Sequence, residues 1–156
     1  MTEPTPAQLS ELIGSIYDRA IDPAAWQETL ARMRVAFGAG NAALNLIDLR
    51  TGKFLLTFLD NMPDHWLAKF DHWGGETIKL WGGADFVMSH PLEEPVVLSR
   101  ANPSVREGKN SYRDEFVSAG FVDAMSLGLA RDDHVVGACV FGRARSAGRF
   151  GDEELS

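Results

Sequence analysis

The chain has 156 residues, of which 45% are hydrophobic and 24% charged, with a formal net charge of -7 and a pI near 5.0. This length and composition predict one globular domain whose core needs no metal or disulfide, and Cys139 has no second cysteine to pair with. The acidic balance argues against a nucleic-acid surface, because phosphate binding requires a concentrated basic field. No apolar leader or long apolar run is present, so we expect a cytoplasmic protein without a membrane span.

Two helices are expected before the first strand. Spacings of three and four predict an amphipathic helix whose inward residues are Leu9, Leu12, Ile13, Ile16, Tyr17 and Ala20. Asp22 is expected to cap a second helix, with Pro23 at its first position and Gly38 after its end. The apolar face of the second helix comprises Trp26, Leu30, Met33 and Phe37.

Two hairpins supply the expected strands. Residues 44–49 and 54–59 form the first pair, and residues 122–130 and 135–142 form the second. Residues 95–98 predict a short edge strand, because proline is tolerated where no ladder N–H is needed. The order of elements therefore predicts an α+β fold, with a central antiparallel sheet flanked by helices in a single domain.

The middle of the chain predicts less regular structure. A third helix is expected from residue 61 or 62 to Gly74-Gly75, and residues 74–95 are expected to be irregular. Long loops in compact domains are usually functional or mobile. Ser111 is expected to open a further helix through a capping box, and Gly120 to end it.

A repeated Asp-His-Trp triplet lies in the third helix, at residues 64–66 and 71–73. Helical residues seven apart are separated by about 10.5 Å along the axis. Zinc-binding histidines on one helix usually sit four apart, so the spacing does not favour a metal site. We expect no metal and no cofactor, with the tryptophans in the core and the polar members at its solvated edge.

Aromatic residues in this middle region favour an apolar pocket with a few polar groups, although an ordinary core under a loop is the alternative. The residues expected to contact a small apolar ligand are Trp66, Phe70, Trp73, Trp81 and Met125. The last hairpin supports a pocket, because Ser126, Gly128 and Ala130 share one face and the partner strand adds Gly137 and Ala138. A face of small residues leaves space that a helix or a ligand must fill.

The last residues are expected to begin a helix. Asp152 is placed to cap it, and Glu153 and Glu154 put negative charge in its first turn. We interpret residues 1–150 as a sensory domain and residues 151–156 as the start of a truncated linker helix, although a frayed natural end is the alternative. This helix and the first helix are expected to pack against a partner subunit or the sheet, in a homodimer.

Three segments resemble the N-terminal sensory region of bacterial LuxR-type helix-turn-helix transcriptional regulators: LIGSIYDRAIDPAAWQETLARM, NSYRDEFVSAGFVDAMSLGLARDDHVVGACVFGRARSAG and RFGDEEL. The resemblance is carried by Tyr17, Asp22, Pro23, Trp26, Tyr112, Arg113, Gly120, Asp123 and Phe150. It implies a PAS- or GAF-like sensory domain, a linker helix and a DNA-binding domain that this chain lacks. DNA would be contacted only through that missing domain.

The best-known LuxR-type regulators bind acyl-homoserine lactones through Trp, Tyr and Asp side chains. That pattern does not align residue by residue here, although the middle region supplies the same residue types in Trp66, Trp73, Trp81 and Asp85. Fold does not fix the ligand.

Two other functions remain open from the sequence. A dimerisation or protein-interaction module would have dry packing over Gly128 and Gly137. A small hydrolase or isomerase would use His90 or His72 as a base and would need a carboxylate within reach. No Gly-x-Ser-x-Gly or His-Glu-x-x-His motif is present, so we expect no enzymatic activity.

Overall fold

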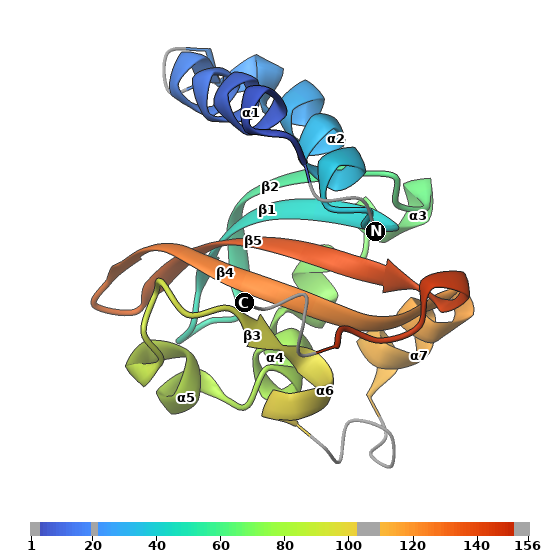
Figure 1. The fold of residues 1–156 in the computed structure, drawn as a ribbon. Coiled ribbons are helices and arrows are strands. Elements are labelled where there is room, and N and C mark those ends of the chain that lie inside the picture. Colours follow the sequence, from blue (N-terminus) through green and yellow to red (C-terminus); the bar gives the residue numbers. More distant parts are fainter. Residues whose placement is uncertain (1–3, 20–21, 103–109, 152–156) are drawn as a thin grey trace.

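A five-stranded antiparallel sheet forms the middle layer of the computed structural model, which describes residues 4–19, 22–102 and 110–151. The strand order is β2-β1-β5-β4-β3 (Figure 1). The strands are β1 (Asn41–Asp48), β2 (Lys53–Asp60), β3 (Val96–Val97), β4 (Phe121–Asp132) and β5 (Val135–Ala144). The two predicted hairpins join one sheet and the short strand β3 lies at its edge, which confirms the predicted α+β fold.

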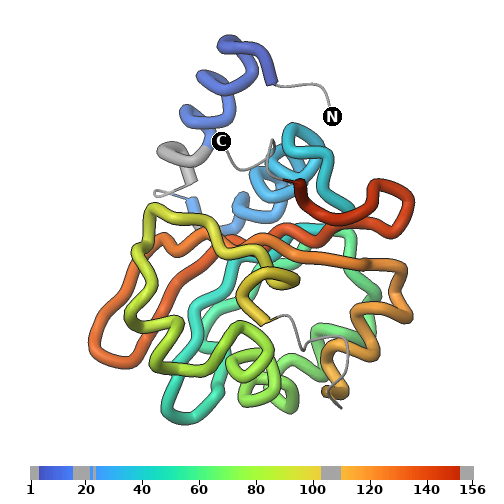
Figure 2. The backbone as a smooth tube through the Cα atoms, turned by 60° about the horizontal axis from the view of Figure 1, so that its bottom comes forward, coloured from blue at the N-terminus to red at the C-terminus, as the bar shows by residue number. Residues whose placement is uncertain are grey.

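Helices cover both faces of the sheet (Figures 1 and 2). On one face lie α1 (Pro6–Arg19), the 3-10 helix η1 (Pro23–Ala25) and α2 (Trp26–Ala36). On the other lie α3 (Asp64–Leu67), α4 (Phe70–Leu80), α5 (Ala84–Ser89), α6 (Leu98–Ala101) and α7 (Ser111–Ser118). A 3-10 turn, η3 (Arg145–Ala147), follows β5.

The period of two along each strand separates two cores. Leu44 on β1 and Cys139, its register partner on β5, pack with Leu30 of α2. The next β1 residue, Asn45, lies beside Ala138 and faces the layer formed by α4 and α5. Each face of the sheet therefore has its own set of partners.

The N-terminal helices follow the sequence pattern in part. Leu30 and Met33 are buried on α2, as predicted. The packing of α1 against a partner subunit stays a prediction, and in the single chain Leu12 is buried but Leu9 and Ile13 are 38% and 54% exposed. The reason is that α1 packs mainly on α2, away from the sheet (Figure 1), and only a narrow strip of it is covered.

Other parts of that prediction lie outside the described residues. They include the side chains of Ile16, Tyr17 and Ala20 and the helix expected from Asp152. The packing of the two terminal helices on each other therefore stays a prediction.

The segment from residue 61 to residue 95 is more helical than expected. The predicted single helix is instead α3 and α4, and the predicted irregular stretch contains most of α4 and all of α5. Gly74 does not end a helix, because α4 runs through it: a Cβ on Gly74 would lie 1.5 Å from the carbonyl oxygen of Gly52 in the β1–β2 turn. Helix α4 ends at Leu80, and the chain then turns at Gly82 and Gly83, whose φ angles of 102° and 93° favour glycine.

The start of α7 also differs from the prediction. Its N-cap is Asn110, whose Oδ1 accepts a hydrogen bond from the backbone N–H of Arg113 at 3.0 Å. Ser111, the predicted cap, instead donates its hydroxyl to the carboxylate of Glu76 on α4 at 2.5 Å. This hydrogen bond, the largest contribution, lowers the pKa of Glu76 and joins α4 to α7. Gly120 ends the helix with a φ of 93°, as predicted.

Candidate ligand-binding site

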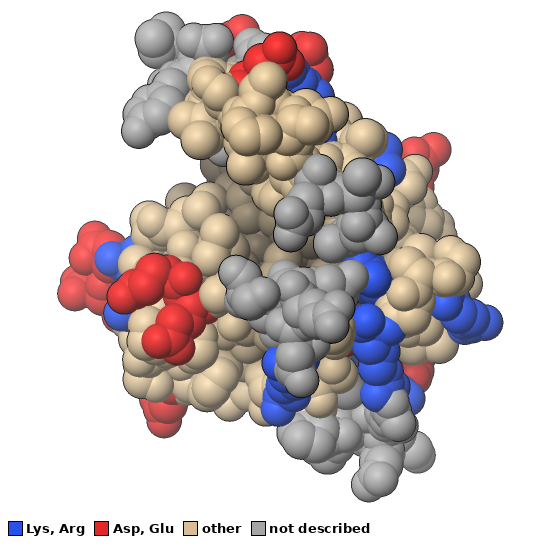
Figure 3. All heavy atoms as spheres, viewed as in Figure 1, with Lys and Arg blue, Asp and Glu red and all other residues tan. Residues whose placement is uncertain are grey.

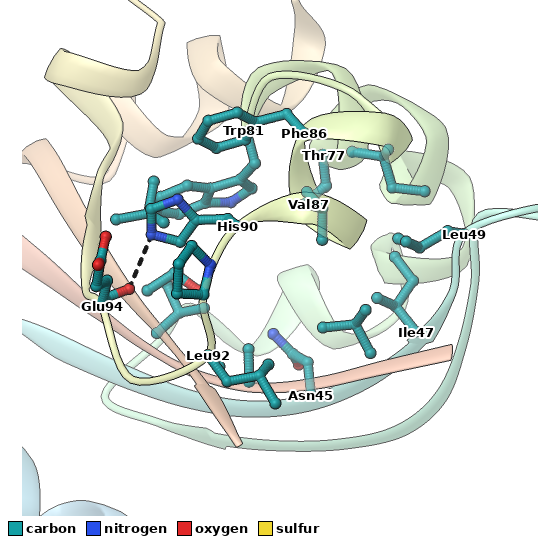
Figure 4. A pocket seen from close by; sticks show the side chains of 18 of the residues that line it. Asn45, Ile47, Leu49, Thr77, Trp81, Phe86, Val87, His90, Leu92 and Glu94 are labelled. Atoms are coloured by element: carbon teal, nitrogen blue, oxygen red, sulfur yellow. Dashed lines mark hydrogen bonds between the residues drawn. The ribbon is translucent and has the colours of Figure 1, made fainter. Parts of the chain in front are cut away.

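A pocket of about 100 Å³ lies between the sheet and the layer formed by α4 and α5 (Figure 4). Most of its lining is apolar and includes Ile47, Leu49, Ile78, Trp81, Phe86 and Val87. Glu94 and Pro91 also line it and are exposed, so they mark its mouth in the segment between α5 and β3.

The floor of the pocket is a patch of small residues on the central strands. Ser126 and Gly128 of β4 and Ala138 of β5 all line it, and Gly128 lies opposite Ala138 in the sheet. A Cβ on Gly128 would lie 2.6 Å from Cδ2 of Leu92, so this glycine lets the segment after α5 approach the sheet. Gly137 does not join the floor, because it lies between Val136 and Ala138 on β5 and so faces the other side of the sheet, where a Cβ would lie 3.5 Å from Leu46. The space expected over the last hairpin is therefore present at Ser126, Gly128 and Ala138. The prediction is wrong for Ala130, because the register shift after Gly128 places it opposite Gly137.

Aromatic side chains form the opposite wall. Trp81, which caps the C-terminus of α4, and Phe86 of α5 line the pocket from the helical side. The ring of His90 packs on Phe86, with centroids 5.3 Å apart, and its Nε2 donates to the backbone oxygen of Glu94 at 3.0 Å (Figure 4). Arg131 on β4 donates to the backbone oxygen of His90 at 2.9 Å. These bonds hold the segment after α5 across the pocket.

Two buried polar atoms in the pocket lack hydrogen-bond partners within the described part of the chain. They are Oδ1 of Asn45 on β1 and Oγ1 of Thr77 on α4, and both residues line the pocket (Figure 4). The hydroxyl of Thr57, which lies opposite Asn45 on β2, is also buried and without a hydrogen-bond partner among the described residues. Buried polar groups in folded proteins are nearly always hydrogen-bonded, so these atoms call for a partner.

The five residues expected from the sequence to contact a ligand occupy three places. Trp81 lines the pocket. Trp66, Phe70 and Trp73 lie together in the neighbouring core, where they are 0%, 5% and 2% exposed. Met125 packs on the other face of the sheet, against the α1–α2 core. The structure thus brings three of the five together, but beside the pocket.

Asn45 and Thr77 were missed by the sequence interpretation. Asn45 is the polar residue in the apolar run Ala42 to Ile47, and the strand period of two places it on the same face as Ile47. That signal was available. Thr77 was hidden because its segment was expected to be irregular rather than helical.

One of the two candidate bases, His90, lines the pocket. His90, a candidate base, donates to a backbone carbonyl rather than to a carboxylate. Within residues 4–19, 22–102 and 110–151, no cluster of three or more His, Cys, Asp or Glu side chains is placed to hold a metal ion. None of the helices there is both long and apolar enough to cross a membrane.

Acidic side chains gather at the end of the molecule where the β4–β5 turn lies (Figure 3). Asp132 and Asp133 are exposed in and before this turn, and Glu93 and Glu94 are exposed before β3. Glu94 also lines the pocket, and Arg131 donates to the backbone oxygen of His90 in the same segment, so charges of both signs lie near the mouth.

No protein-family model and no curated protein matches the sequence. Solved structures resemble the fold. The N-acylhomoserine lactone dependent LuxR family transcription factor CepR2 from Burkholderia cenocepacia aligns with a TM-score of 0.61 at 16% identity, over 97% of this chain and 85% of its own. The LBD domain of VqsR from Pseudomonas aeruginosa aligns with a TM-score of 0.61 at 16% identity, over 97% of this chain and 86% of its own.

A GAF domain is similar as well. The GAF domain of a phosphoenolpyruvate-protein phosphotransferase from Coxiella burnetii aligns with a TM-score of 0.54 at 15% identity, over 96% of this chain and 84% of its own. At these identities the similarity shows the fold alone, which resembles GAF domains and LuxR-type ligand-binding domains.

Proposed function

We propose that this chain is a sensory domain that binds a mostly apolar small molecule between its sheet and α4–α5. The observation that carries this proposal is the pocket itself, an apolar space with unpartnered polar atoms in its walls. Small-molecule sites usually have this composition. Among the five residues expected from the sequence, Trp81 would touch the ligand, and Trp66, Phe70 and Trp73 would support the wall beside it.

The output in this proposal is a LuxR-type DNA-binding domain that follows the chain. CepR2, whose fold is similar, is described as a lactone-dependent transcription factor of that family. Strand β5 supports a connection, because it lines the pocket through Ala138 and continues to Arg143. The guanidinium of Arg143 lies 5.1 Å from the ring centre of Phe150. A ligand would change the output by binding one arrangement of this segment better than another.

A homodimer is a second candidate role. The exposed Leu9 and Ile13 on α1 favour it, because apolar side chains on an outer helix suit a symmetric interface. Native mass spectrometry would report the stoichiometry, and a monomer at every accessible concentration would contradict this role.

Replacing Trp81 tests the ligand proposal. In thermal melts against a library of uncharged metabolites, we expect wild type to be stabilised by at least one compound. Trp81→Ala should lower the affinity for that compound about 10-fold, because an aromatic wall supplies both contact area and shape.

Trp26→Ala is the matched control, since Trp26 is also partly buried but packs on the opposite side of the sheet. This control should lower the melting temperature and leave the affinity unchanged. Equal loss of affinity in both variants, or no stabilising compound for wild type, would contradict the proposal.

A further inference from the structure

The polar atoms of the pocket are placed on two different walls. Asn45 projects from the sheet, and Thr77 lies on α4 (Figure 4). Each has a side-chain oxygen that is buried and without a partner among the residues described. Leaving such an atom unpaired is unfavourable, whereas an apolar residue of the same shape would carry no such cost. Unpartnered polar atoms in a mostly apolar lining therefore suit a bound molecule better than they suit the stability of the empty domain.

The charge of the lining restricts that molecule. Among the residues that the structure describes, no lysine or arginine lines the pocket, and the one lining carboxylate, Glu94, lies at the exposed mouth. A buried ion without a countercharge is strongly disfavoured. The part of the ligand that enters the pocket must therefore be uncharged.

The size of the space restricts it further. A volume of about 100 Å³ is somewhat smaller than the engineered cavity of about 150 Å³ that holds benzene. The floor at Gly128 and Ala138 and the wall at Trp81 present flat or small surfaces. A single ring fits this description, and a longer ligand would extend through the mouth.

We propose that Asn45 is the specificity-determining residue of the pocket, which selects uncharged, ring-sized molecules bearing an O–H or N–H donor. This inference rests on the proposed function. Oδ1 of Asn45 would accept a hydrogen bond from the donor of the ligand. The hydroxyl of Thr77 would donate a hydrogen bond to an oxygen of the ligand. A phenolic hydroxyl can donate and accept a hydrogen bond.

Phenol and toluene provide a direct test, because they share a shape and differ in a hydroxyl against a methyl group. Their dissociation constants are measured by titrating the backbone amide resonances of the isotope-labelled chain. Wild type should bind phenol more tightly than toluene. Asn45→Leu should shift the ratio toward toluene by about 10-fold or more, since it removes the acceptor and keeps the volume.

Two further variants complete the experiment. Val87→Ala trims the apolar wall, so it should weaken both probes and leave their ratio unchanged. Thr77→Val should shift the ratio in the same direction as Asn45→Leu, and it serves in place of that variant if Asn45→Leu does not fold.

The outcomes separate this inference from the proposal on which it rests. A wild type that prefers toluene, or a preference for phenol that survives in folded Asn45→Leu, would overturn the role of Asn45 while the pocket remained a binding site. Failure of both probes to move any resonance of the pocket would overturn both. A ratio that changes only in the two polar variants would support the inference.

Discussion

Trp73→Ala is expected to destabilise the chain by about 3 to 5 kcal/mol, the usual range for emptying a large buried aromatic site. Trp73 is 2% exposed. Its ring lies 5.5 Å from both Trp66 and Tyr112, and Nζ of Lys69 lies 5.5 Å from the ring centre. Alanine would leave a cavity among side chains that α3, α4 and α7 hold in place. Urea denaturation of wild type and variant measures the difference.

This substitution also decides between two interpretations of the same tryptophan. As a core residue it should govern stability and leave ligand affinity largely unchanged in whatever fraction stays folded. Trp73→Phe is the control, since it retains a ring and should recover much of the lost stability. A loss below about 1 kcal/mol together with lost ligand binding would instead make Trp73 a wall of the pocket.

Gly74→Ala is expected to destabilise the chain by about 3 kcal/mol, at the upper end of the usual range for overpacking. The added Cβ would lie 1.5 Å from the carbonyl oxygen of Gly52. That atom belongs to the backbone, and Gly52 has a φ of 70° in a tight turn, so no side chain can rotate away. The β1–β2 turn and α4 must separate to admit the methyl group, although alanine is the better helix former.

Gly75 provides a matched control in the same helix. A Cβ on Gly75 meets nothing within 4 Å. Gly75→Ala should therefore stabilise the chain by about 0.5 to 1 kcal/mol through helix propensity alone. Thermal melts of the two neighbouring variants should move in opposite directions. Equal shifts of the same sign would show that the contact with Gly52 does not hold α4 in place.

The strands were predictable because their signal is local. Residues 122–130 and 135–142 are two β-type runs separated by a short turn, a pattern typical of a hairpin. In the structure these residues form β4 and β5, which pair with each other. The same period of two placed Ser126 and Gly128 on one face, and the pocket lies above them. Local pattern therefore located the floor of the site.

The helical wall was not predictable in the same way. A glycine pair such as Gly74 and Gly75 usually signals a helix end. Here residue 74 must be glycine because a Cβ would collide with the carbonyl oxygen of Gly52, which is distant in the sequence. With α4 cut short in the prediction, the pocket-facing Thr77 was not considered. Trp73 and Trp81 are chemically identical, and only the packing of α7 on α4 decides which of them is core.

The central claim is that the pocket between the sheet and α4–α5 holds a small molecule. Ala138→Phe is designed to fill it, because Ala138 lies on its floor beside Gly128 and Asn45. Native mass spectrometry compares wild type and this variant after incubation with a small-molecule extract of the cells that produce the protein. Thermal melts first establish that the variant is folded.

We predict one non-covalent small-molecule adduct per chain on the wild type and its absence from the folded Ala138→Phe variant. The absence of any adduct on the wild type, or the same adduct at equal occupancy on both proteins, would contradict the claim.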